Sequence, residues 1–207
     1  MPLTKITADT LNDGAVTTAK IVDANVTTAK IADSNVTTAK IADSNVTPAK
    51  LSQPMTQGTA PATTSGTSKD FTGIPSWAKK ITISFNGVST SGTSALLVQL
   101  GSTTIATSGY ASTSVTAAAA GNTVGTSTAG FIMQAASASA VHSGHMVLTN
   151  VSGNIWASSH VDAPLTTNVT TGAGAVTLSG VLDRLRVTTV NGTDTFDAGS
   201  VNILYEG

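Results

Sequence analysis

The sequence contains no cysteine and few charged or aromatic residues. Without cysteine, the chain has no disulfides, no thiol for catalysis and no cysteine ligands for zinc. Charged residues make up 10% and aromatic residues 4% of the 207 residues, which is low for a soluble enzyme domain. The net charge of -1 gives no electrostatic attraction to a phosphate backbone, so we expect no nucleic-acid partner.

Long apolar segments are missing as well. No apolar run approaches the roughly 18 residues that cross a bilayer, so we expect no membrane insertion. The residues from Met1 to Lys5 lack the apolar centre of a signal peptide, which predicts synthesis in a cytoplasm. The glycines, including Gly172 and Gly174, do not form a phosphate-binding loop, and we predict no cofactor.

The abundant residues are Thr, Ser, Ala, Gly and Val. Thr and Val are branched at Cβ and fit the pleated surface of a strand, whereas Gly and Asn supply turns. The composition therefore predicts an all-β protein with small side chains.

A ten-residue repeat occupies the N-terminal part of the chain. Near-identical copies span Ile21–Lys30 (IVDANVTTAK), Ile31–Lys40 (IADSNVTTAK) and Ile41–Lys50 (IADSNVTPAK), and a degenerate copy spans Leu11–Lys20. Each copy has apolar anchors at its first and sixth positions. Together with the apolar residue that follows the last copy, the anchors are Leu11, Val16, Ile21, Val26, Ile31, Val36, Ile41, Val46 and Leu51.

The five-residue spacing of the anchors excludes a regular helix or strand. Five residues turn an α-helix by 500°, so neighbouring anchors would share no face, and in a strand they would alternate between faces. The chain must turn within each copy, which the Asp-x-Asn sequences favour. Pro48 replaces a Thr of the other copies, which fits the first position of a short helical turn after a Thr N-cap.

A single copy of this segment has too few apolar side chains to offset the entropy of ordering its backbone. Several chains wrapped around one axis could bury the anchors together, so we predict a small cyclic oligomer that forms a rod-like stalk over residues 1–51, with the anchors as its core. The alternative is a disordered low-complexity linker.

The pattern changes after the repeats. Residues 52–69 are rich in Pro, Gly, Ser and Thr without periodicity, which predicts a linker. Over residues 70–207 the sequence alternates between strand-like runs and turns, which predicts a β-sandwich head of jelly-roll type. The runs are Lys80–Asn86, Ala95–Leu100, Thr103–Thr107, Ala129–Gln134, His145–Val151, Asn154–Val161, Ala175–Ser179, Leu182–Val190 and Ser200–Glu206. The stretches Ser112–Ser127 and Ala135–Ala140 are expected to be loops, or strands packed against a neighbouring subunit.

These segments resemble a known family. The Thr-Thr-Ala-Lys-Ile and Asp-x-Asn-Val repeats are similar to stalk repeats of phage tail fibres and related virion fibre proteins. Residues 73–93 (GIPSWAKKITISFNGVSTSGT) and 178–206 (LSGVLDRLRVTTVNGTDTFDAGSVNILYE) resemble a C-terminal domain of phage tail fibre proteins. The resemblance implies trimers, β-rich tips and attachment to a host or particle, and it implies no catalytic residues.

We therefore expect a structural, non-enzymatic subunit of a bacteriophage virion, made in the bacterial cytoplasm. Its expected partners are its own copies, other virion proteins that bind the N-terminal segment, and a glycan or protein of the host surface at the head. Many tail fibres begin with a large docking domain, whereas the repeats here start within the first dozen residues. A short docking peptide would place the chain on the tail, and repeats docked on the shell would make it a head fibre or decoration protein of the capsid.

Two further functions are considered from the sequence, metal binding and glycan cleavage. His142 and His145 are candidate ligands of a metal on a symmetry axis. Asp183, Asp194, Asp197 and Glu206 are candidate carboxylates of a glycan-cleaving spike, although such enzymes usually need a larger cleft. His160 lies near Asp162 in the sequence, but no nucleophile motif accompanies them.

Overall fold

The computed structural model describes residues 53–135 and 137–207, together with parts of the repeats: residues 16, 17, 19, 21, 26–32, 35–43, 45–47, 50 and 51. The chain divides into two units, Met1–Lys50 and Leu51–Gly207. We call the first the repeat segment and the second the head, and describe each by itself.

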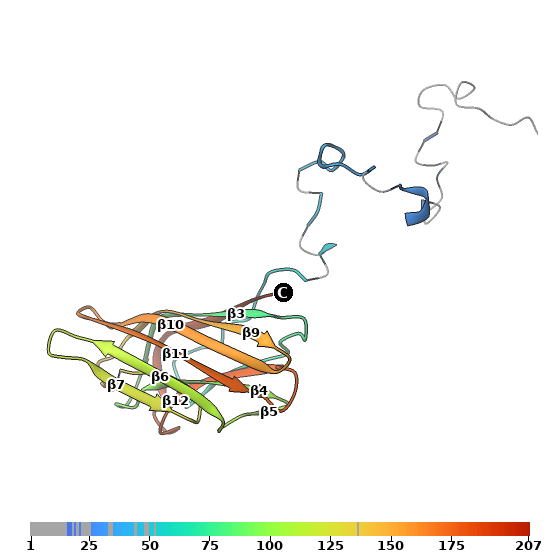
Figure 1. Cartoon of the computed structure of the whole chain (residues 1–207). Coiled ribbons are helices and arrows are strands. Elements are labelled where there is room, and N and C mark those ends of the chain that lie inside the picture. The colour runs from blue at the N-terminus through green and yellow to red at the C-terminus, as the bar shows by residue number, and fades with distance from the viewer. Residues whose placement is uncertain are drawn as a thin grey trace, which may run out of the picture. The chain divides into compact units, whose positions relative to one another are not determined.

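The head is built from two antiparallel sheets, which confirms the all-β prediction (Figure 1). In spatial order, the larger sheet consists of β1 (Thr56–Gln57), β13 (Phe196–Glu206), β3 (Lys80–Thr90), β9 (His142–Ser152), β10 (Ile155–Leu165), β11 (Asn168–Thr177), β6 (Tyr110–Ala117) and β7 (Thr123–Ser127). The smaller sheet consists of β2 (Lys69–Thr72), β12 (Arg184–Thr189), β4 (Leu96–Ser102) and β5 (Thr104–Ile105), and β8 (Phe131–Met133) also pairs with β4. A jelly roll has eight strands in two sheets, so the eight strands of the larger sheet alone depart from the jelly-roll prediction.

The core lies between the two sheets, where alternate residues of each strand face inward. In β3 these are Ile81, Ile83 and Phe85, as the alternation of that run predicts. Trp156 is 3% exposed and belongs to the same core, whereas Trp77 is half-buried and packs against Tyr205. The head therefore buries its apolar core within a single chain.

Strand β6 joins the two sheets by hydrogen bonds from its side chains. Its four inward residues are Tyr110, Ser112, Ser114 and Thr116. The Tyr110 hydroxyl accepts from the backbone N–H of Leu100 at 2.7 Å, and Ser112 Oγ accepts from that of Ile132 at 3.0 Å. Ser114 Oγ accepts from the backbone N–H of Gln134 at 3.1 Å, and Thr116 donates to the carbonyl oxygen of the same residue. In this part of the interior, hydrogen bonds made by hydroxyl groups help to hold the two sheets together, as apolar contacts do elsewhere in the core.

Of the two alternatives expected for the Ser112–Ser127 stretch, loops or strands, the structure has strands. The stretch contains most of β6 and all of β7, which pair with each other from Ser112–Ser127 to Thr116–Thr123. The expected alternation of polar and apolar residues is absent because hydroxyl residues face the core. Thirteen strands occur in the described residues, against about nine predicted, and the additional ones are β1, β2, β6 and β7.

The predicted linker over residues 52–69 packs on the head. Thr56 pairs with Tyr205 in β1, and Ala62 forms a bridge with Ser200. Thr63 is 1% exposed and donates its hydroxyl to the carbonyl oxygen of Gly199. Short pairings of this kind leave no periodic signal in a segment rich in turn residues.

In the repeat segment, successive copies repeat one local conformation. A short 3₁₀ turn forms at Thr28–Lys30 (η3) and at Thr38–Lys40 (η4), which confirms the predicted helical turn. Thr37 is the N-cap of η4 with an extended backbone, but its side chain makes no capping hydrogen bond. By the repeat pattern Pro48 corresponds to Thr38, the first residue of η4. Within the described part of the chain, no helix has the length and hydropathy to cross a membrane.

The inter-sheet hydrogen bond of Tyr110 can be tested directly. Tyr110→Phe keeps the ring, which lies edge to face on Phe131, but removes the partner of the buried Leu100 N–H. We expect the free energy of unfolding to fall by about 1–3 kcal/mol, as for other buried donors left without a partner. Urea denaturation followed by tryptophan fluorescence measures it, because both tryptophans lie in the head. Tyr205→Phe, at a half-exposed ring, should change the value by less than about 0.5 kcal/mol.

Candidate functional site

The predicted stalk anchors are exposed in the single chain. In the described residues their exposed fractions run from 40% for Ile41 to 56% for Val16. The other described anchors lie between these values: Ile21, Val26, Ile31, Val36, Val46 and Leu51. Leu11 lies outside the described residues. One chain by itself therefore does not shelter these side chains from water.

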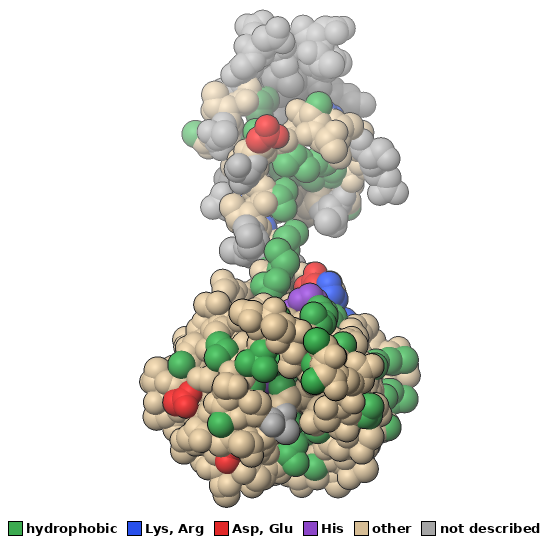
Figure 2. Space-filling view, turned by 90° about the vertical axis from the view of Figure 1, so that its left-hand side faces the viewer, with side chains coloured by type: hydrophobic (Ala, Val, Ile, Leu, Met, Phe, Trp, Pro, Cys, Tyr) green, Lys and Arg blue, Asp and Glu red, His purple; other side chains and the backbone are tan. Residues whose placement is uncertain are grey.

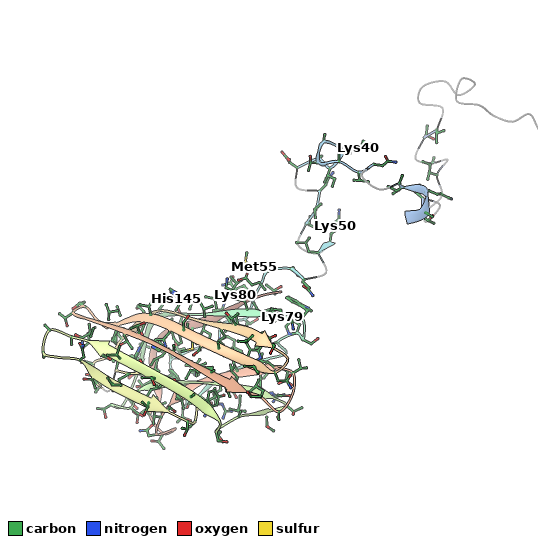
Figure 3. All side chains as sticks on the ribbon, in the orientation of Figure 1. Lys40, Lys50, Met55, Lys79, Lys80 and His145 are labelled. Carbon is green, nitrogen blue, oxygen red and sulfur yellow. The ribbon has the colours of Figure 1, made fainter. Side chains whose placement is uncertain are left out.

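Several polar groups of the described repeat residues have partners within their own repeat. The backbone N–H of Asn45 donates to the carbonyl oxygen of Ala42 at 3.1 Å, and that of Lys50 donates to Thr47 at 2.9 Å. The Nζ atom of Lys40 donates to the carbonyl oxygen of Asn35 at 2.5 Å, and Lys50 donates to Asn45 at 2.8 Å (labelled lysines in Figure 3). These two lysines therefore close the turn of their own repeat, while the anchors, like the other described residues of the repeats, are exposed.

The two candidate metal ligands point to opposite faces of β9. His142 is 3% exposed and faces the core, where its Nδ1 atom lies 2.7 Å from Oδ2 of Asp162. His145 is exposed on the outer face, because residues three apart in a strand face opposite ways. The structure does not bring the pair together. In the described residues no three His, Asp or Glu side chains are grouped so that they could hold a metal ion.

A second buried histidine lies close to the first pair. The Nε2 atom of His160 on β10 is 3.1 Å from Oγ of Ser114 on β6. Glycine at position 172 of β11 leaves room for this ring, because a Cβ atom there would clash with it. We call Ser114, His142, His160 and Asp162 the buried polar cluster. This half of the inter-sheet layer is polar, because these four side chains are buried. Among the described residues, two buried side-chain atoms have no hydrogen-bond partner, Oδ1 of Asp162 and Oγ of Ser158.

The buried polar cluster contains the residue types of a catalytic triad, but its geometry favours a structural role. Ser114 is 1% exposed, and its hydroxyl donates to the carbonyl oxygen of Thr171 at 3.3 Å. The Asp162 carboxylate is bonded to His142, whereas triad chemistry would require it to orient His160. The serine therefore has neither access to a substrate nor a relay to the carboxylate.

Local partners also hold the candidate carboxylates. Asp183 accepts two hydrogen bonds from Arg184, at 2.8 and 3.1 Å, and these lower the pKa of the Asp183 carboxyl. Asp194 accepts from the Asn191 side chain at 2.7 Å, which lowers its pKa too, and from the Ser94 backbone at 2.9 Å. Asp197 bonds Ser89, and Glu206 lies 2.6 Å from Nζ of Lys80. Each carboxylate has a structural partner of its own.

The outer face of the larger sheet is the most extended feature of the head. We call the outward-facing residues of β6, β9, β10 and β11 the neutral face, because His145 is their only ionisable side chain. Cross-strand neighbours form rows of small or β-branched residues across β10, β11 and β6: Ala157–Ala175–Ala111, Ser159–Ala173–Thr113 and Val161–Thr171–Val115. Figure 3 labels His145, Lys79 and Lys80 along one margin of the head. Lys80 begins β3, which is the neighbour of β9 in the larger sheet.

Aliphatic side chains and shallow hollows mark the neutral face. Val151, Val161 and Val169 are 62%, 41% and 50% exposed. A hollow of about 540 Å³ lies where β6, β7 and β11 meet, lined in part by Thr113 and Ala173. Another, of about 430 Å³, is lined by mostly apolar residues at the ends of β9 and β10: Ser139, Val141, Ser143, Ala163, Pro164, Leu165 and Thr166. Neither hollow has a charged lining residue. Sequence analysis did not identify this face, because it appears only once the strand order is known.

Comparison of the chain with protein-family models, with curated proteins and with solved structures gives no match.

The buried polar cluster predicts a loss of stability in acid. Burial lowers the pKa of His160 below its ordinary value of 6.5, an effect that the nearby Asp162 carboxylate opposes and His142 reinforces. The unfolded chain then takes up a proton before the folded chain does. The contribution of His160 to the free energy of unfolding is therefore fully present above about pH 6.5 and is lost as the pH falls below that value.

The free energy of unfolding, measured by urea denaturation between pH 8 and pH 5, should fall more steeply for the wild type than for His160→Gln. His145→Gln, on the outer face, should keep the wild-type dependence. Equal slopes for the wild type and His160→Gln would contradict the assignment.

Proposed function

We propose that the chain is a structural fibre subunit of a bacteriophage virion, a tail fibre in which the repeat segment forms a homotrimeric stalk. The head contributes to attachment at a host surface, with a glycan or protein as its ligand. Other virion proteins bind the N-terminal segment, and the chain is made in the bacterial cytoplasm before it joins the particle. The proposal assigns no catalytic residue, metal or cofactor to the chain.

The observation that carries the proposal is the exposure of the anchors in register. Ile31, Val36, Ile41 and Val46 are each at least 40% exposed and recur with a period of ten residues. Burying an exposed aliphatic side chain against a partner is favourable by about 25 cal/mol for each Å² of its surface that is removed from water. A partner with the same period is another copy of the same segment, and symmetric closure around an axis buries every anchor in the same way.

The repeated local turns support parallel association. The Lys40 to Asn35 and Lys50 to Asn45 hydrogen bonds give neighbouring copies the same closed turn. Copies of one shape can stack along an axis as repeat arrays do, so each ten-residue unit would add one layer to the stalk. The resemblance of these repeats to phage fibre stalks gives the same assignment.

The stalk is tested by one substitution at an anchor. Ile41→Asp places a carboxylate where the proposed core lies, and burying an unpaired charge costs several kcal/mol. We expect the full-length wild type to sediment as three chains, and Ile41→Asp to shift toward smaller species at micromolar concentration. Thr37→Asp, which adds the same charge at a position that is not an anchor, should remain trimeric. A monomeric wild type over a wide concentration range would overturn the proposal.

The place of the chain on the particle is tested by labelling. A gold-labelled antibody against the head, applied to purified phage particles, should mark the tail in electron micrographs. Label on the capsid would show that the chain is a capsid fibre and not a tail fibre. Particles without label would contradict a role in the virion.

A further inference from the structure

The neutral face combines features that rarely occur together on a monomer. Its four strands, β9, β10, β11 and β6, lie side by side without a Lys, Arg, Asp or Glu side chain on the outer surface (Figure 1). In Figure 2, which views the molecule from one side, hydrophobic and uncharged side chains cover most of the head and charged ones are few. The face mixes Ala and Val with Ser and Thr. Depletion of charged residues is typical of the buried centre of a protein interface.

The size of the face suits a protein partner. Strands about 4.8 Å apart and about ten residues long, at about 3.4 Å per residue, give four strands an area of roughly 650 Å². A stable protein interface buries about 800 Å² on each partner. The neutral face therefore approaches the area that one such contact requires.

We propose that a second copy of the head packs on the neutral face, so that the heads of one fibre dock against each other. This inference rests on the proposed stalk, which would hold the heads together at an effective concentration near the millimolar range. A contact that is too weak to join separate heads in solution would then form between the heads of one fibre.

The charge distribution favours a copy of this chain over an unrelated partner. Two faces without charged groups meet without repulsion, whereas a charged partner would lose hydration without gaining an ion pair. Several charged side chains of the head form ion pairs outside the neutral face: Asp70 with Arg186 at 2.7 Å, Asp183 with Arg184 and Glu206 with Lys80.

The shape of the face also fits a copy of itself. It carries both protruding valines, such as Val161 and Val169, and the hollow lined by Thr113 and Ala173. Projection and recess on the same chain are what a head-to-tail contact in a closed ring requires.

The test uses single thiols in the full-length protein, which has no cysteine of its own. Ser159→Cys places a thiol at the exposed centre of the neutral face, and Thr72→Cys places one at an exposed position of β2 in the smaller sheet. Labelling with a maleimide dye is followed over time, and the number of chains is measured by sedimentation. We expect Ser159→Cys to react at least tenfold more slowly than Thr72→Cys in the oligomer.

A second substitution separates docking from slow intrinsic reactivity. Val161→Asp, added to Ser159→Cys, should restore fast labelling while the repeats keep the oligomer intact. Tryptophan fluorescence checks that each variant is folded, and Ala173→Cys, the cross-strand neighbour of Ser159, replaces a variant that does not fold. Equal rates at Ser159 and Thr72 in an intact oligomer would overturn head docking and leave the stalk standing. A monomeric wild type would overturn both, and slow labelling that Val161→Asp does not relieve would overturn docking alone.

Discussion

The structure depends on where apolar side chains can be buried within one chain. In the head, Ile83, Leu100 and Leu185 are fully buried between two sheets, so this unit has a core of its own. In the repeat segment, Ile41 and Val46 stay exposed although the backbone turns and the lysines are satisfied locally. Because burial of apolar surface is the main favourable term in folding, the two units meet this constraint differently. The head buries its apolar side chains within one chain, whereas the proposed stalk would bury them only when several chains associate.

The polar half of the inter-sheet layer shows a second way to join two sheets. Ser112, Ser114 and Thr116 bond the backbone of the segment around β8, and Tyr110 bonds β4. Directional bonds fix the relative position of the sheets more tightly than small apolar side chains would, but each leaves a buried group that depends on its partner. A domain with few aromatic residues thereby gains a defined interior, with the protonation of His160 as its weak point.

Sequence patterns predicted the part of the head that is held by aliphatic side chains. Ile81, Ile83 and Phe85 alternate with polar residues, and the hairpin across Ser152 and Gly153 joins β9 to β10 as expected. The sequence did not distinguish strand β6 from a loop because Ser and Thr face inward and Ala faces outward, which reverses the usual signal. Strand β7 has no buried residue and therefore gives no alternation to detect. The His142–Asp162 pair was missed although that hairpin brings it together, since Asp162 lies opposite Gly144, two residues from His142. The neutral face depends on strand order, which no local pattern reveals.

Charge is used sparingly and mostly locally throughout the described residues. Arg184 and Arg186 bind Asp183 and Asp70 within the smaller sheet, and Lys40 and Lys50 close turns of their own repeats. Exposed ion pairs of this kind contribute little to stability, and screening by salt weakens them further. The proposed contacts between chains use uncharged surfaces: the anchors of the repeats and the outer surface of β6, β9, β10 and β11. Association through such surfaces should therefore persist at high salt, where contacts made by charged groups would weaken.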